Sequence, residues 1–316
     1  MKIDLVYLWV DDTDFAWRKK IGKYKNSMEF SLYENYDSDA IDICRFYNND
    51  ELRFSLRSVE KFAPWINKIF IITDNQIPEW LNLENDRVKI VNHNEIIPED
   101  KLPLFNSCAI ESCIPYIDGL SEYFLYANDD TFFWDKVSED FFFREGKPIF
   151  RFADKISPHK NYKHLYGKTL QYSYNVISKR YKINFPLCFP HHNIDAYRKS
   201  FFIECIEEFK DEFTQTLEHR FRQDKDMQRI GIAYYMMAKG EGIFKNIKSN
   251  WINEYILRFP LDSQHCSISR FSHYKYKNCR SKLMCLNDCR CTTNRDREQV
   301  KEYLLSKFPC KSSFEK

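Results

Sequence analysis

The sequence predicts an α/β fold in which a mostly parallel sheet is flanked by helices. Two observations support this prediction. Short apolar and β-branched runs alternate with segments of helical periodicity, which is the pattern of β-α-β units. Several of the apolar runs also end abruptly in acidic or amide residues. Open α/β sheets bind ligands at the carboxyl ends of their strands, so we expect the functional site at that edge.

Length and composition bound the remaining possibilities. A chain of 316 residues suits one large domain, and we expect an α/β core over residues 1–150 and a helical, loop-rich part over 151–316. With 48 Lys and Arg against 46 Asp and Glu, the net charge of +2 provides no bulk field for nucleic acid or a membrane. The chain has only 7 glycines, which argues against a glycine-rich phosphate loop, so bound phosphates would need side chains or a metal.

The same features suggest an intracellular, cytoplasmic protein. The apolar run near the N-terminus is too short for a secretory signal, and no stretch approaches the length of a membrane span. The 11 cysteines are odd in number and spread along the chain, which suits reduced thiols. Peripheral association with the inner face of the membrane stays open.

The first strand is predicted over Ile3 to Val10 (IDLVYLWV), a β-branched and aromatic run. It ends in Asp11, Asp12 and Asp14, whose carboxylates are candidate ligand groups. Trp9 beside them is either a stacking platform for a base or sugar or a core residue, and its burial tendency favours the core.

A β-α-β unit is predicted next. Residues 18–48 are polar and predict a loop or short helix. A helix follows from Asp50 until Pro64 stops it. Its apolar stripe consists of Leu52, Leu56 and Val59. Lys68 to Thr73 (KIFIIT) then reads as a strand, so a right-handed parallel crossover is expected.

Two further strands complete the predicted sheet. Val88 to Val91 is a short strand, and Asn106 or Ser107 can cap a helix over residues 108–117. Tyr123 to Tyr126 is the last strand of this part and is expected to be buried. Four strand ends can therefore line one edge.

The last of these strands runs into Asn128, Asp129 and Asp130. Adjacent carboxylates beside an amide are hard oxygen donors, which suit Mg²⁺ or Mn²⁺ and through it substrate phosphates. The alternative is an acidic turn, because Asn and Asp are common turn residues.

The second half of the chain is less regular. Residues 154–185 lack clear periodicity and are expected to form an excursion over the site. Helices are expected over 197–209, from the Arg220 to Asp226 region to Ala238, and near 297–307. Residues 243–276 read as strand or loop.

Four blocks of the chain carry a family resemblance. The first is IDLVYLWVDDTD, and the second runs from NDELRFSLRSVEKFAPWINKIFIITDNQIPEWLN through LPLFNSCAIES to GLSEYFLYANDD. The third is His192 followed by RKS, HRFR and DKDMQ, and the fourth is KLMCLND. With these blocks the chain resembles the Stealth proteins over almost its whole length. That family includes bacterial capsular polysaccharide phosphotransferases and the animal GlcNAc-1-phosphotransferase.

The resemblance implies a function. It implies transfer of a sugar 1-phosphate from a nucleotide sugar, such as UDP-GlcNAc, to a hydroxyl of a glycan acceptor. It further implies a Rossmann-like fold, a divalent Mg²⁺ or Mn²⁺ cofactor and a role in capsule or exopolysaccharide synthesis. Residues 1–150 would bind the nucleotide sugar and metal, and 151–316 would complete the active site.

The resemblance also assigns functional residues of the family to positions in this sequence. The family's metal acids fall on Asp129 and Asp130, and its functional His and Arg fall on His192 and Arg222, so we expect His192, Arg222 and Asp130 to be catalytic. Asp226, four residues after Arg222, is a candidate to orient it. Donor-binding expectations fall on Trp9, Asp11, Asp12, Asp14, Asn128, Asn287 and Asp288.

The chemistry of phosphoryl transfer, considered without the resemblance, also requires residues of these types. Phosphoryl transfer depends on positioning and charge neutralisation, which a metal and a guanidinium provide. Histidine is the side chain best suited to accept a hydroxyl proton near pH 7. The chain departs from the family at Ala127, where a larger aliphatic residue is usual, and at Ile194, which replaces a common Pro. The second change leaves the backbone near His192 open.

Three alternatives remain at the level of sequence. A metal-dependent glycosyltransferase could use the same acids and release a nucleoside diphosphate. A carbohydrate-binding protein with a decayed site is disfavoured, because the acids, His192 and Arg222 are all present. A zinc site is conceivable at Cys279, Cys285, Cys289 and Cys291, but the spacing differs from paired CxxC motifs and favours reduced cysteines.

Overall fold

The computed structural model describes residues 1–25, 46–155, 162, 164–191, 193–247, 256–261, 282–288 and 292–316. A five-stranded sheet with strand order β3-β2-β1-β4-β9 forms its centre. The strands are β1 (Ile3–Leu8), β2 (Ile69–Thr73), β3 (Val88–Asn92), β4 (Tyr123–Asn128) and β9 (Asp195–Arg198). The first four run parallel to one another, and β9 is antiparallel to β4. The predicted α/β fold with a mostly parallel sheet is thereby confirmed.

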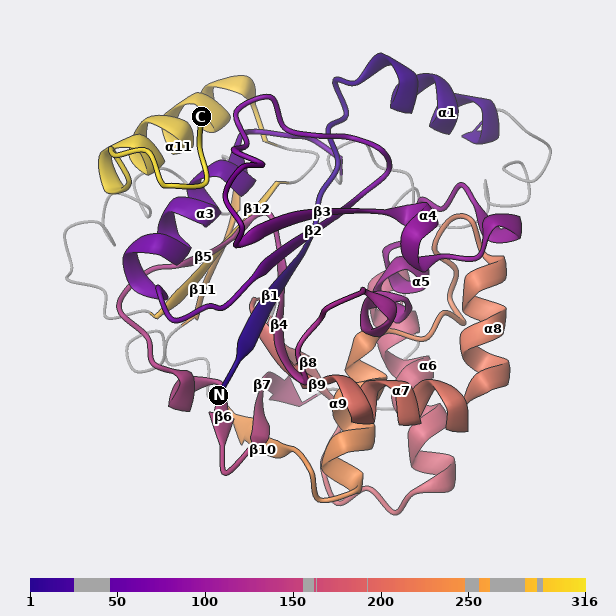
Figure 1. Cartoon of the computed structure of the whole chain (residues 1–316). Coiled ribbons are helices and arrows are strands. Elements are labelled where there is room, and N and C mark those ends of the chain that lie inside the picture. The colour runs from indigo at the N-terminus through magenta and orange to yellow at the C-terminus, as the bar shows by residue number, and fades with distance from the viewer. Residues whose placement is uncertain are drawn as a thin grey trace.

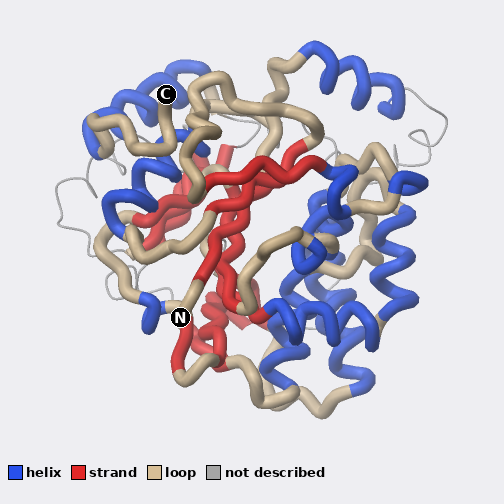
Figure 2. Tube along the Cα trace, in the orientation of Figure 1, coloured by secondary structure: helices blue, strands red, loops and turns tan. Residues whose placement is uncertain are grey.

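Helices cover both faces of this sheet (Figures 1 and 2). The helices are α1 (Phe15–Lys25), α3 (Glu51–Phe62), α4 (His93–Ile96), α5 (Ser107–Ser112), α6 (Leu165–Arg180), α7 (Lys199–Glu208), α8 (Lys210–Glu218), α9 (Arg229–Ala238) and α11 (Asn294–Lys307). In Figure 1, α3 and α11 lie on one side of the sheet and the group from α5 to α9 lies on the other. None of the described helices is long and apolar enough to cross a membrane.

The two faces of the sheet belong to two apolar clusters, because successive residues of a strand point to opposite sides. Val6, Phe70 and Tyr126 pack toward α5, α6, α7 and α9. Leu5 and Ile71 pack toward Leu52, Leu56 and Val59 of α3, the stripe expected from the sequence. The strands are thus buried on both faces, which explains their continuous apolar sequence.

Two smaller sheets adjoin the main one. One has the order β10-β7-β6 with β8 paired to β7, and the other has the order β11-β12-β5. Their strands are β5 (Thr131–Phe133), β6 (Phe143–Arg144), β7 (Lys147–Lys155), β8 (Cys188–Pro190), β10 (Ile243–Asn246), β11 (Ile256–Leu261) and β12 (Leu283–Asp288). Single 3-10 turns lie at Glu99–Lys101, Ile114–Tyr116 and Glu139–Phe141. The rest of the region 243–276 lies outside the described residues.

The expectation that residues 154–185 lack regular structure is wrong, because half of this segment forms helix α6. The buried face of α6 includes Thr169 and Ser173 as well as Leu170 and Ile177. Both hydroxyls are satisfied inside the protein: Gln228 Nε2 donates to Thr169 Oγ1, and Gln228 N donates to Ser173 Oγ at 2.8 Å. Polar residues in the buried stripe hid its helical period from the sequence.

Three boundaries also differ from expectation. The segment 18–48 begins inside a helix, since α1 extends from Phe15 to Lys25, and 26–45 lies outside the described residues. The helix expected over 108–117 ends at Ser112, and a 3-10 turn with Pro115 follows. Residue 197 belongs to β9, so α7 starts only at Lys199.

The final residues of the chain pack against α3. Glu315 accepts hydrogen bonds from Arg57 Nε at 2.7 Å and from Arg53 Nε at 2.6 Å. Arg57 Nη1 also donates to the carbonyl of Phe308 at 2.7 Å. The C-terminal segment therefore helps to hold the helix that begins at Glu51.

Candidate active site

The predicted carboxylates lie in the turn between β4 and β5. Asp129 and Asp130 are half-buried, and the backbone N–H of Asp130 donates to Asp129 Oδ1 at 3.1 Å. Thr131 Oγ1 donates to the carbonyl of Asn128 at 2.6 Å, which closes the turn. Because Leu8 pairs with Asn128, this turn adjoins the end of β1. The two carboxylates thus lie at the predicted edge and stay accessible to a ligand.

Glu51 is a third carboxylate at this position, and the sequence reasoning missed it. It is the first residue of α3 and is buried. Burial, together with the charge of Asp130, raises its pKa to about 7, although hydrogen bonds from Asn49 oppose this. Burial, followed by the charges of Glu51 and Asp130, also holds the pKa of Asp129 well above its usual range. The charges of these three carboxyl groups therefore act on one another.

This arrangement fits a hard divalent cation. The charges that act on Asp129 are those of two further carboxylates, so a bound cation would relieve their repulsion. Among the described side chains, no three His, Cys, Asp or Glu converge as a complete metal site. Mg²⁺ characteristically takes one or two carboxylates and completes its shell with water and substrate phosphates. Asp129 and Asp130 could hold such an ion together with a diphosphate.

Hydroxyl groups of α3 fix the strand that follows the acidic turn. Ser55 Oγ donates to the carbonyl of Thr131 at 2.5 Å and contacts Tyr7 Oη at 2.7 Å. Ser58 Oγ accepts from the backbone N–H of Phe133 at 3.0 Å. The start of α3 and the acidic turn are therefore held in a fixed relation.

The fourth sequence block reaches the same turn through β12. Cys285 pairs with Thr131, and the backbone N–H of Leu286 donates to the carbonyl of Asp130 at 2.8 Å. The buried thiol of Cys285 lies 3.5 Å from Asp130 Oδ2. Asn287 and Asp288 continue β12 beyond this pairing, and their side chains lie outside what the structure describes. Of the candidate zinc ligands, Cys279, Cys289 and Cys291 also lie outside it.

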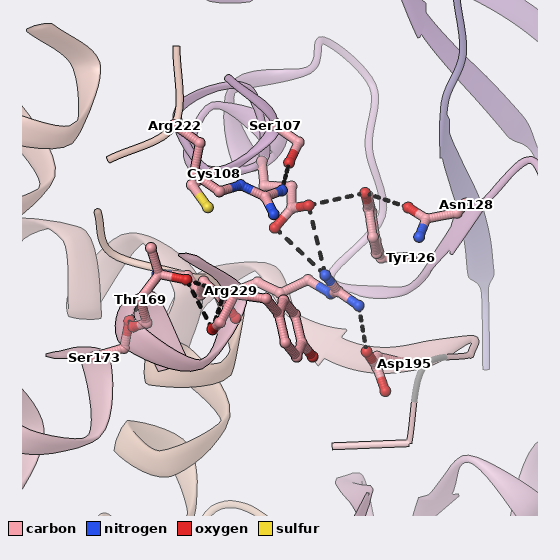
Figure 3. A network of polar contacts seen from close by, with 12 residues as sticks. Ser107, Cys108, Tyr126, Asn128, Thr169, Ser173, Asp195, Arg222 and Arg229 are labelled. Atoms are coloured by element: carbon pink, nitrogen blue, oxygen red, sulfur yellow. Dashed lines mark hydrogen bonds and ion pairs between the residues drawn. The ribbon is translucent and has the colours of Figure 1, made fainter. Parts of the chain in front are cut away.

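Arg222 is half-buried, and no described carboxylate forms an ion pair with it. Its Nη2 donates to the hydroxyl of Ser107, as Figure 3 shows. Within the described part of the chain, its guanidinium makes no ion pair with a carboxylate. The more distant charges of Cys108, Glu111 and Asp226 raise the pKa of Arg222 although its burial opposes this, so it stays charged. The guanidinium of Arg222 can therefore donate hydrogen bonds to two oxygens of an anionic ligand.

Asp226 organises the loop that carries Arg222. Its carboxylate contacts His219 Nδ1 at 2.6 Å and accepts from Asn106 Nδ2 and from the backbone N–H of Gln223, both at 2.7 Å. Asp226 is fully buried. It contacts His219 and Gln223, on either side of Arg222 in the sequence, and its orienting role stays a prediction.

Arg229 differs from Arg222 because its charge is committed. Its Nη2 donates to Asp195 Oδ2 at 3.0 Å, and its Nη1 lies 3.5 Å from both carboxylate oxygens of Glu111. The ring of Tyr126 lies 4.6 Å from the guanidinium carbon (Figure 3). Arg229 is thus an internal ion-pair centre, and no local feature of the sequence distinguishes it from Arg222.

The acids after β1 have mainly local partners. Asp11 Oδ1 accepts from the backbone and hydroxyl of Thr13 at 2.9 and 2.7 Å, and Asp14 Oδ1 caps α1 by accepting from Trp17 N at 2.9 Å. Asp12 is buried, which raises its pKa, and it accepts from Asn48 N at 3.2 Å. Trp9 is 7% exposed and packs in the core, as its size favoured. These contacts shape the loop beside the acidic turn, and the donor-binding roles of the four residues stay predictions.

His192 lies outside the described residues, so its predicted role stays a prediction. The strands on either side of it are described. β8 ends at Pro190 and pairs with β7, and β9 starts at Asp195 and pairs with β4. The buried Ile194, where the family commonly has Pro, packs with the core residues Leu125 and Ala127.

Comparison with protein-family models gives three matches along the chain. Residues 1–29 match Stealth protein conserved region 1, residues 45–150 match conserved region 2 and residues 191–239 match conserved region 3. The first match holds the acids after β1. The second holds Glu51, Asp129 and Asp130, and the third holds His192, Arg222 and Arg229.

Curated relatives agree with these matches. The capsular polysaccharide phosphotransferase fcs1 of Haemophilus influenzae is 37% identical over 76% of this chain and 67% of its own length. The capsular polysaccharide phosphotransferase LcbA of Neisseria meningitidis is 36% identical over 79% of this chain and 70% of its own. The exopolysaccharide phosphotransferase cps2G of Lactiplantibacillus plantarum is 28% identical over 99% and 96%. The chain spans only 33% of the Streptomyces coelicolor exopolysaccharide phosphotransferase SCO2592.

Solved structures similar to this chain are more distant in sequence. The galactosyltransferase LgtC, in complex with donor and acceptor sugar analogues, is 11% identical, with a TM-score of 0.43 over 96% of this chain and 95% of its own. The glycosyltransferase GlyE of Streptococcus pneumoniae has a TM-score of 0.43 and 12% identity, over 96% of this chain and 61% of its own.

Proposed function

Because the chain belongs to the Stealth family, we propose that it transfers a sugar 1-phosphate from a nucleotide sugar to a hydroxyl of a glycan acceptor. The product would be a phosphodiester-linked unit of a capsular or other surface polysaccharide, and a nucleoside monophosphate would leave. A UDP-sugar such as UDP-GlcNAc is the donor class we favour. The names of the curated relatives, capsular and exopolysaccharide phosphotransferases, support this choice of reaction.

One contrast in the site supports the proposal most. Burial and the charges of Glu51 and Asp130 leave Asp129 in need of positive charge, whereas Arg222 has positive charge without an ion-pair partner among the described residues. A diphosphate with a divalent cation satisfies both requirements at once. The cation compensates the acids, and the phosphate oxygens occupy the arginine fork.

Each group then has a defined part in the reaction. A Mg²⁺ or Mn²⁺ ion bound to Asp129 and Asp130 would supply neutralisation of the diphosphate. Arg222 would bind oxygens of the sugar-linked phosphate and draw negative charge onto them as the transition state forms. Arg222 thereby makes phosphorus, and not the anomeric carbon, the electrophile.

His192 would complete the transfer as the general base. It would accept the proton of the acceptor hydroxyl while the hydroxyl oxygen forms its bond to phosphorus. The bond from that phosphorus to the oxygen bridging the two phosphates breaks in line, and the electron pair leaves with the nucleoside monophosphate. No bond to the anomeric carbon changes, so the sugar keeps its anomeric configuration.

The remaining predicted site residues would bind the donor nucleotide. Asp11, Asp12, Asp14 and Asn128 adjoin the acidic turn through β1 and β4. Trp9 would support this loop from the core, since it is buried. Asn287 and Asp288 would join them, because β12 pairs beside Asp130. We place the enzyme in the bacterial cytoplasm, with peripheral association with a polysaccharide assembly complex.

An isotope experiment tests the proposed bond cleavage. A UDP-sugar with ¹⁸O in the oxygen between sugar and phosphate is incubated with acceptor and Mg²⁺, and the products are analysed by mass spectrometry and ³¹P NMR. We expect UMP without label and a labelled sugar phosphate in the product. Labelled UDP would mean that the anomeric bond breaks, and the enzyme would then be a glycosyltransferase.

The variant His192→Ala tests the base in the same assay. Transfer should slow much more than donor binding weakens, because the base acts on the acceptor. Intact turnover with weakened donor affinity would assign His192 to donor binding. The base would then be sought among Asp11, Asp12 and Asp288.

A further inference from the structure

The hydroxyl of Tyr126 connects the acidic turn to a buried ion pair. Tyr126 lies in β4, two residues before Asn128, and is fully buried. Its Oη lies 2.9 Å from Asn128 Oδ1 and 3.1 Å from Glu111 Oε1. Residues two apart in a strand share one face of the sheet, so this contact runs along the strand toward Asp129.

These contacts form a closed ring of polar groups. Glu111 from α5 pairs with Arg229 from α9, and Arg229 pairs with Asp195 from β9. The guanidinium carbon of Arg229 lies 4.6 Å from the centre of the Tyr126 side-chain ring, which closes the ring of contacts, and Asp195 lies opposite Tyr126 in the antiparallel pairing of β9 and β4. Four elements thus meet at Tyr126, and Figure 3 shows Asn128 attached to this ring at Tyr126.

The ring also interacts electrostatically with Arg222. Glu111, whose Oε1 lies 3.1 Å from Tyr126 Oη, is one of the charges that raise the pKa of Arg222. Burial and the charge of Glu111 hold the pKa of Tyr126 well above its usual range, so its hydroxyl stays protonated and can donate. One carboxylate therefore lies between the group that orients Asn128 and the arginine proposed to bind phosphate.

We propose that Tyr126 is a positioning residue, whose hydroxyl fixes the Asn128 amide and with it the start of the turn that carries Asp129 and Asp130. The inference rests on the proposed function, because the turn is positioned for a cation and diphosphate. Because this hydroxyl contacts both Glu111 of α5 and Asn128, the placement of α5 and α9 restrains the acidic turn. Without it, the Asn128 amide loses a hydrogen bond that restrains its rotation, and the two acids lose a fixed neighbour.

The alternative is a ring that only stabilises the fold. Tyr235 provides a matched comparison, because it is also fully buried and its hydroxyl also lies near two carboxylates, Glu204 at 2.7 Å and Glu208 at 3.0 Å. Tyr235 lies on α9, and its partners belong to α7. Tyr126→Phe and Tyr235→Phe each remove one hydroxyl and should lower Tm alike. Only Tyr126→Phe should change the site.

The test compares Mn²⁺ binding to the full chain, measured by electron paramagnetic resonance with UDP present. Tyr126→Phe should weaken Mn²⁺ binding by about tenfold, as loss of an outer partner of a metal site usually does. Its kcat should fall by a similar factor, while Tyr235→Phe stays within about twofold of wild type on the same scale. Equal Mn²⁺ affinity in the two variants and wild type would overturn the positioning role.

A metal-free measurement separates this inference from the proposed function. The side-chain amide signals of Asn128 are observed by ¹⁵N NMR after asparagine labelling and assigned with Asn128→Asp. In Tyr126→Phe these signals should shift and narrow as the amide gains rotational freedom, and Tyr235→Phe should leave them unchanged. If wild type binds no Mn²⁺, the proposed metal role fails while this result stands. Unchanged Asn128 signals in Tyr126→Phe would overturn the inference even when Mn²⁺ binds.

Discussion

Burial, and after it the charge of Glu51 at the start of α3, raises the pKa of Asp129 in the turn that follows β4. Helix and strand thus bring two like charges together at the site, and neither carboxylate makes an ion pair within the described chain. Such an arrangement costs stability in the absence of a cation. It explains how the site could prefer the metal-bound state.

The first prediction is that Asp129→Asn stabilises the metal-free protein and abolishes activity. Relief of repulsion on the order of 1 kcal/mol should raise Tm by about 2 °C for a chain of this size. Differential scanning fluorimetry in EDTA measures this effect. Wild type should gain Tm with Mn²⁺ and UDP, and the variant should not. Full transfer activity of wild type in excess EDTA would contradict the metal requirement.

The second prediction compares two arginines that lie close together. Arg222→Lys should lower kcat about a hundredfold, because a point ammonium cannot reproduce a planar fork across two phosphate oxygens. Its Tm should change little, since the described guanidinium contact is one hydroxyl. Arg229→Lys should instead lower Tm, because two carboxylates lose a shared partner. Activity of Arg222→Lys within about threefold of wild type would make Arg222 a structural residue.

The third prediction concerns the thiol beside Asp130. A thiol is a weak hydrogen-bond donor, and Cys285 Sγ lies 3.5 Å from Asp130 Oδ2. Cys285→Ser keeps a donor and should retain activity within about threefold, whereas Cys285→Ala should lose about tenfold. Cys113→Ala, at a buried cysteine in the opposite apolar cluster, serves as the control. Equal losses in the Ser and Ala variants would indicate that only the volume of sulfur matters.

The fourth prediction concerns acid stability. Burial alone would raise the pKa of Glu315, but hydrogen bonds from Arg57, the backbone of Ser312 and Arg53 lower it to about 2. A carboxylate with a lowered pKa stabilises the fold above its unfolded pKa of about 4.5 and loses this effect as pH falls toward 2. The effect should be on the order of 2 kcal/mol.

Glu315→Gln measures this contribution. The variant should unfold at a lower urea concentration than wild type at pH 7, and the difference should shrink steadily between about pH 4.5 and pH 2. Transfer activity at pH 7 in the folded variant should change little. A stability difference that does not depend on pH would assign the contribution of Glu315 to packing.

Strands and their ends were predictable because their chemistry is local. A buried parallel strand is a continuous apolar run, and the residue after it meets the edge of the sheet, so Asp129 and Asp130 could be placed from sequence alone. The start of α3 was also predictable from Leu52, Leu56 and Val59. These features depend on residues close together in the chain.

Glu51, Glu111 and Arg229 were not predictable because their roles depend on pairing across the fold. Glu51 reads as an acidic residue in the first turn of a helix, where helix dipoles favour acids in any case. Its approach to Asp129 depends on how α3 packs on the sheet. Likewise, only the folded structure shows that Arg229 forms ion pairs with two carboxylates and that Arg222 donates a hydrogen bond to a hydroxyl.

The packing of the C-terminal segment on α3 has a consequence for synthesis. The ion pair between Arg57 and Glu315 joins residues separated by 258 positions. During translation, α3 can form early from its local sequence, but its buried arginine receives its carboxylate only after Glu315 has left the ribosome. Closing so long a loop is entropically costly and slow. The nascent chain should therefore carry an acidic turn whose supporting helix is only partly anchored until Glu315 has emerged, and stable donor binding should follow that step.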